Sequence, residues 1–147
     1  MNELNLYIKN YFGISNEQAE IVRQLFKPQH LSKGEFHTAS GSYHSNLSFV
    51  KSGYLRVYET KEEKEITQWL SSPNEFVVDI GTLVFDTPAR RHIQAITDCE
   101  LYTISREDYR NINQQIPSWP EFEKRLISKC FTVLEDRIFN FISMTAE

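Results

Sequence analysis

Residues 47–58 read LSFVKSGYLRVY, and this stretch decides the fold class. Its two halves, 47–51 and 54–58, are short apolar-rich runs in which apolar and polar residues largely alternate, and a Ser-Gly pair separates them. Alternation of this kind is typical of half-buried strands. Similar runs recur at 66–70, 91–95 and 101–104, between glycines and prolines, and the polar residues 61–64 read as a hairpin tip. The pattern predicts a mainly β domain, a small antiparallel sandwich or roll with flanking helices.

Helices are predicted on both sides of the strands. Residues 2–26 read as helical, with Ser15 and Gln18 in capping-box spacing and Pro28 just beyond the end. A short helix is predicted from Ser105 to before Pro117. The chain therefore divides into a helical segment (1–28), a β-roll (29–105) and a second helical segment (106–147).

The last predicted helix, 118–143, contains no Gly and no Pro after Pro120. One apolar stripe follows its length at three- and four-residue steps: Ile127, Cys130, Phe131, Leu134, Ile138, Phe141 and Ile142. A second face carries Trp119, Phe122, Leu126 and Val133. A helix that is apolar on two faces needs two partners. At about 1.5 Å per residue the helix is nearly 40 Å long, and a domain of this size is too small to cover its whole length. We expect it to pack on its own domain and on a second copy in a homodimer.

Composition excludes several classes of protein. Sixteen Lys and Arg stand against twenty Asp and Glu, a net charge of −4, so the chain lacks the charge of a stand-alone nucleic-acid binder. No run of about 18 apolar residues predicts a membrane helix, and Glu3 lies where an export signal carries positive charge. A cytoplasmic location follows as the expectation. Cys99 and Cys130 are too few for a disulfide scaffold, and we expect both to be buried.

The order of helix, β-roll and long helix resembles the sensor half of the Crp/Fnr family of bacterial transcription regulators. Four local motifs carry the resemblance: LSKGEF (31–36), LSFVKSGYLRVY (47–58), KEIT (64–67) and AITDCELYTIS (95–105). The resemblance implies a cyclic-nucleotide-binding-domain fold, a small-molecule effector and a dimerisation helix. DNA binding would belong to a winged helix that is absent from these residues. We expect a fragment of a longer regulator; a naturally shortened relative is the alternative.

In cyclic-nucleotide-binding members of the family, a Gly-Glu pair on a short helical turn and an Arg followed by a small residue hold the ligand. Aligned without gaps from Phe76 to Ala95, this chain has Val78 and Asp79 at the first pair and Ala89 and Arg90 at the second. The candidate ligand-binding residues are Asp79, Ile80, Gly81, Thr82, Arg90 and Arg91. Strand alternation places Arg91 on the face of Ile93 and Ala95, toward the pocket.

Cyclic AMP is therefore expected to bind weakly or not at all, and the effector stays unidentified. A structural role for the two arginines, in which they pair with Asp79 or Asp86 on a solvated sheet edge, is equally compatible with the sequence.

Catalytic and metal motifs are missing from the sequence. It has no nucleophile elbow, P-loop or dinucleotide glycine motif. None of the four histidines, His30, His37, His44 and His92, has a spacing typical of a haem or metal ligand, and His37 lacks the second histidine of a cupin motif. We predict no enzyme activity and no metal site, and the sequence identifies no cofactor. The alternatives are a stand-alone ligand-binding or interaction module and, third, a cupin-type enzyme.

Overall fold

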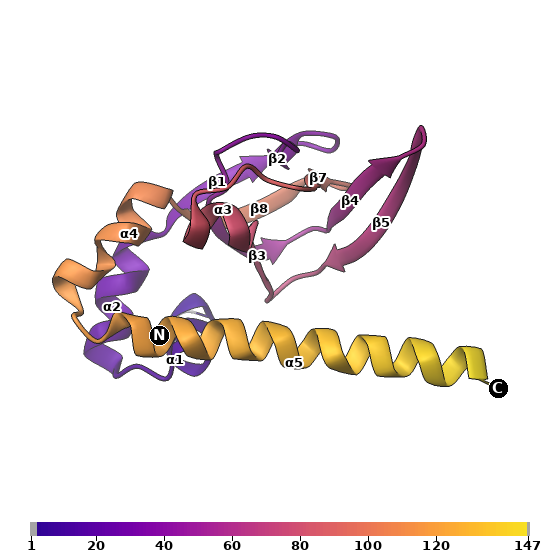
Figure 1. Cartoon of the computed structure of the whole chain (residues 1–147). Helices are drawn as coiled ribbons and strands as arrows, with labels where there is room; N and C mark the ends of the chain where they lie inside the picture. The colour runs from indigo at the N-terminus through magenta and orange to yellow at the C-terminus, as the bar shows by residue number, and fades with distance from the viewer. Residues whose placement is uncertain (1–2, 147) are drawn as a thin grey trace. The chain divides into compact units, whose positions relative to one another are not determined.

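The computed structural model describes residues 3–146, which fall into two compact units. Residues 24–111 form the β-roll unit, and residues 3–23 together with 112–146 form the helical unit (Figure 1).

The β-roll unit contains two antiparallel sheets of four strands. Sheet A has the order β1 (Lys27–Leu31), β8 (Cys99–Ile104), β3 (Leu47–Ser52) and β6 (Phe76–Val77). Sheet B has the order β2 (Phe36–Thr38), β7 (His92–Ala95), β4 (Leu55–Lys61) and β5 (Lys64–Ser71). The predicted fold class is thus confirmed.

Side chains from both sheets meet in one apolar core. Its buried members are Leu31, Val50, Leu55, Val77, Ile93, Ala95, Cys99 and Leu101. Ile93 and Ala95 face this core, as alternation along β7 predicts. Beside it, the β3–β4 turn depends on Gly53, whose φ is +93°. A Cβ there would lie 2.4 Å from the carbonyl oxygen of Asp98, so only glycine fits.

Strands β4 and β5 form the long hairpin visible in Figure 1. Lys61 pairs with Lys64, so Glu62 and Glu63 form the two-residue tip, both at positive φ. The predicted hairpin tip is confirmed. The register shifts between Val57 and Tyr58, a bulge that the alternation pattern does not predict.

Two helices of the β-roll region follow from short capping signals. Helix α3 (Ile80–Phe85) begins at Asp79. Helix α4 (Arg106–Gln115) begins where predicted, because the Asp108 amide donates to the Ser105 hydroxyl at 3.0 Å.

The predicted helical segment 2–26 is helical over most of its described residues. The structure has two helices there, α1 (Glu3–Phe12) and α2 (Asn16–Leu25), separated at Gly13 with φ +67°. The predicted capping box is confirmed as the start of α2: the Gln18 amide donates to the Ser15 hydroxyl, and the Ser15 amide to the Gln18 side chain.

Helix α5 (Trp119–Ala146) is one uninterrupted helix that reaches the C-terminal end in Figure 1. Its first two turns are packed: the Trp119 ring lies 4.6 Å from that of Phe12 between centroids, and Leu126 is buried. After Leu126, every residue from 127 to 145 is exposed. The helix therefore has a packed proximal part and an exposed distal part.

Candidate functional site

The N-terminus of α3 is organised by the Asp79 carboxylate. Its Oδ1 atom accepts from the Thr82 amide at 2.9 Å and from the Thr82 hydroxyl at 3.0 Å. Its Oδ2 atom accepts from the Arg90 amide at 3.3 Å. A short aspartate with an extended backbone is well suited to cap a helix in this way. Three protein donors therefore already occupy this carboxylate.

The amide of Asp79 begins a second feature, a line of polar side chains through the β-roll. It donates to the Ser45 hydroxyl at 2.8 Å, and Ser45 lies 3.0 Å from the Thr38 hydroxyl. Next in the line, the Thr38 hydroxyl lies 2.7 Å from His37 Nδ1, and His37 Nε2 lies 2.9 Å from the Ser48 hydroxyl. The Ser48 hydroxyl then lies 2.7 Å from that of Thr103, which donates to the Gln29 side-chain oxygen at 2.6 Å. We call these six side chains the His37 chain: Ser45, Thr38, His37, Ser48, Thr103 and Gln29.

Donor and acceptor counts fix the direction of the His37 chain. Thr103 donates its only proton to the Gln29 oxygen, so Ser48 must donate to Thr103. Ser48 therefore accepts from His37 Nε2–H. In the neutral imidazole, Nδ1 is then an acceptor for the Thr38 hydroxyl.

Burial keeps the His37 imidazole neutral. It lowers the pKa of His37 to about 4, although a backbone hydrogen bond with Asn46 favours the charged form. The direction of the chain and the charge state of its central residue are thus consistent.

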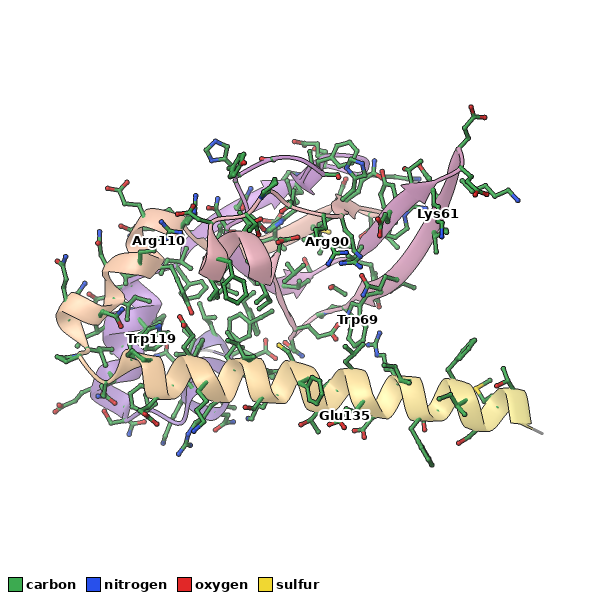
Figure 2. All side chains as sticks on the ribbon, in the orientation of Figure 1. Lys61, Trp69, Arg90, Arg110, Trp119 and Glu135 are labelled. Atoms are coloured by element: carbon green, nitrogen blue, oxygen red, sulfur yellow. The ribbon has the colours of Figure 1, made fainter. Side chains whose placement is uncertain are left out.

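The two arginines of the predicted site lie in different surroundings. The Arg90 side chain, labelled in Figure 2, is exposed, and the residue contributes its backbone amide to Asp79. Arg91 directs its guanidinium to β4, where Nε lies 3.6 Å from Oε2 of Glu59. Pairing of these side chains with Asp79 or Asp86 is therefore wrong.

Asp86 instead ends α3 in the left-handed conformation and pairs with two arginines of α4, Arg106 and Arg110. The Arg106 amide also donates to Asn46 at 3.2 Å. Both ends of α3 are thereby fixed by charged or polar contacts.

The structure brings together part of the predicted ligand site. Asp79, Thr82 and the Arg90 backbone are in contact, and a Cβ at Gly81 would lie 3.4 Å from Asp79 Oδ1. Thr82 is fully buried and Ile80 is half-buried. Arg91 belongs to a separate pair with Glu59.

Several residues of this region were not predicted. Ser45 and His37 come from a loop and a three-residue strand, and no local pattern marks them. Glu59 follows from register, because two further steps along β4 from Val57 place it opposite Arg91.

A second candidate site is the predicted apolar stripe on α5. Six of its residues are the predicted dimer interface, and we call these six the α5 stripe: Ile127, Cys130, Phe131, Leu134, Ile138 and Phe141. All of them are exposed. The exposed fraction reaches 69% at Phe141 and is 38% at Leu134. Figure 2 shows side chains projecting from this part of α5 around Glu135. Expected burial of both cysteines is thus confirmed for Cys99 and wrong for Cys130.

Within residues 3–146, no His, Cys, Asp and Glu side chains cluster closely enough to hold a metal ion. The same residues contain no helix long and apolar enough to cross a membrane.

Comparisons with solved structures identify similar folds. The Catabolite Activator Protein of Thermus thermophilus is 20% identical with a TM-score of 0.72; the alignment covers 95% of this chain but only 63% of that protein. The N-terminal domain of a transcriptional regulator from Streptomyces coelicolor A3(2) is 19% identical with a TM-score of 0.72, over 92% of this chain and 95% of that one. The sensor domain of the transcriptional regulator DNR from Pseudomonas aeruginosa is 19% identical with a TM-score of 0.66, over 90% and 85%.

No curated protein matches the sequence. The family model of the cyclic nucleotide-binding domain matches residues 28–115. These residues include helices α3 and α4 and all eight strands, apart from the first residue of β1. This match extends over more than half of the sequence, and the chain therefore belongs to the cyclic nucleotide-binding domain family.

Proposed function

We propose that this chain is the effector-sensing and dimerisation domain of a Crp/Fnr-type DNA-binding transcription regulator. It acts in the cytoplasm, without catalysis, as a homodimer, and DNA is bound by a domain outside these residues. The observation that carries the proposal is the exposed α5 stripe on a long helix that follows a cyclic-nucleotide-binding fold. The solved relatives described as sensor or N-terminal domains of transcriptional regulators support it.

The physical argument for dimerisation is the cost of leaving the stripe in water. Full burial of a large apolar side chain stabilises a protein by roughly 1.5–3 kcal/mol, and the stripe holds five such side chains. A parallel pair of α5 helices around a two-fold axis would bury the same stripe from both chains.

The effector is proposed to bind in the β-roll and to shift the population of α5 arrangements in the dimer. Three features favour an effector other than cyclic AMP. Val78 stands where the family has glycine, and Ala89 where it has the phosphate-binding arginine. The Asp79 carboxylate is occupied by Thr82 and by the Arg90 amide.

The test of this proposal is sedimentation velocity of two double variants and the wild type. Leu134→Glu with Ile138→Glu places two charges on the α5 stripe and should give a monomer. Thr132→Glu with Asn140→Glu adds the same charge to exposed positions of α5 outside the stripe and should leave a dimer. A wild-type chain that is monomeric at high micromolar concentration would contradict the proposal.

A further inference from the structure

The inner face of sheet B ends in a charged pair. Along β4 and β7, Leu55 pairs with Ala95 and Val57 pairs with Ile93. One further step of two residues places Glu59 opposite Arg91 on that face. The row therefore passes from apolar pairs in and against the core to an ion pair whose Nε–Oε2 distance is 3.6 Å.

This pair is partly exposed to solvent. The Arg91 side chain is 30% exposed and that of Glu59 52%, whereas Leu55 and Ala95 are almost fully buried. Trp69 of β5, labelled in Figure 2, pairs with Val57 and adds a half-buried aromatic ring to the same row. A molecule that binds at this exposed end of the row meets a guanidinium and a carboxylate together.

We propose that Glu59 is a specificity-determining residue that makes this face of the β-roll reject anions. The inference rests on the proposed function, which places the effector in the β-roll. An anion that binds Arg91 must displace Glu59 and then remain close to its negative charge. At a few ångströms in a partly screened site, this repulsion is large enough to change affinity about tenfold.

A different class of ligand satisfies both members of the pair. An uncharged or zwitterionic molecule can offer an acceptor to Arg91 and a hydroxyl or ammonium donor to Glu59. Neither charged side chain is then left without a partner. We therefore assign the effector to this class, with at least one donor and one acceptor group.

The outer face of the same sheet supplies a matched control. Arg56 and Glu65 pair there at 2.7 Å, and their side chains are 24% and 53% exposed, close to the values for Arg91 and Glu59. Arg56 alternates with Leu55 and so points away from the core. Glu65→Gln removes the same charge from a similar pair on the opposite face.

The experiment is titration calorimetry with cyclic AMP as the anionic probe. Glu59→Gln should bind it at least about tenfold more tightly than the wild type, and Glu65→Gln should stay within about twofold of the wild type. Adding Arg91→Ala to Glu59→Gln should remove the gain. Thermal melts of all variants establish that each is folded at the temperature of the titration.

The inference would be overturned by no gain in Glu59→Gln or by an equal gain in Glu65→Gln. A gain in Glu59→Gln that survives Arg91→Ala would also overturn it, since the repulsion would not act through that pair. Failure of the proposed function looks different. The wild-type chain would be monomeric in sedimentation, while the calorimetric difference between the two faces of sheet B would remain.

Discussion

The β-roll interior and the distal part of α5 depart from the usual distribution of polar and apolar residues in opposite directions. In the β-roll, His37 is half-buried and the hydroxyls of Thr38, Ser45 and Ser48 beside it are buried. On α5, Phe131 and Phe141 are exposed. Buried polar groups and exposed apolar surfaces are the informative exceptions to normal burial. The His37 chain finds its hydrogen-bond partners within one chain, whereas the α5 stripe is exposed in the described chain and would be buried only in the proposed dimer.

The largest predicted loss of stability comes from truncating a side chain in the packed proximal part of α5, compared with one in the exposed distal part. Trp119→Ala removes a ring that is 1% exposed and packs against the Phe12 ring, so we expect the free energy of unfolding to fall by about 3–5 kcal/mol. Phe139→Ala truncates a ring that is 69% exposed and lies outside the stripe, and should cost less than about 0.5 kcal/mol. Urea denaturation at one fixed protein concentration measures both.

Equal losses in these two variants would contradict the division of α5. They would mean that the distal part is packed as tightly as the proximal part in solution. The protein concentration must be held constant, because the proposed dimerisation would contribute to apparent stability.

The second effect tests the β-roll side of the comparison through pH. The pKa of His37 is about 4 in the folded chain and about 6.5 when it is unfolded, so the unfolded state binds more protons between these values. Stability contributed by neutral His37 is thus present above pH 6.5 and is lost as the pH falls toward 4, by about 3 kcal/mol.

Denaturation of the wild type and His37→Gln from pH 7.5 to pH 4 measures this loss as a difference, which removes the titration of the other groups. His44→Gln, at an exposed position, is the control and should follow the wild type. A His37→Gln profile parallel to that of the wild type would show that the imidazole is not buried in its neutral form.

Local patterns in the sequence are sufficient to predict much of the fold. Alternation locates the main strands, and the long run without Gly or Pro predicts α5, because strand and helix periods are properties of neighbouring residues. The capping box at Ser15 predicts the start of α2, but the end of α1 at Gly13 was missed, since an isolated glycine is tolerated in many helices and only its positive φ ends this one. The His37 chain was missed because it joins residues from β1, β2, β3, β8 and a loop, a non-local arrangement.

In the candidate site too, the contacts between residues far apart in the sequence could not be predicted. The sequence predicted Asp79 as a site residue, and that role stays a prediction. Its contacts could not be predicted, because they depend on how far a short carboxylate reaches. Asp79 bonds the amide of Thr82 in its own helix and that of Arg90 across the loop. The pairing of Arg91 with Glu59 depends on the register of β4 with β7, which alternation alone does not give.

The smallest predicted loss of stability comes from substitutions of Asp79, which distinguish the roles of its two carboxylate oxygens. Asp79→Ala removes the helix cap and should lower the free energy of unfolding by about 0.5–2 kcal/mol. Asp79→Asn keeps an acceptor for the Thr82 amide, but its NH₂ group cannot accept from the Arg90 amide. Asn should therefore cost less than Ala. Amide hydrogen exchange distinguishes the variants: Asn should retain protection of Thr82 and lose that of Arg90, whereas Ala should lose both. Full protection of the Arg90 amide in Asp79→Asn would mean that Asp79 does not hold the loop between α3 and β7, and that its carboxylate is open to a ligand.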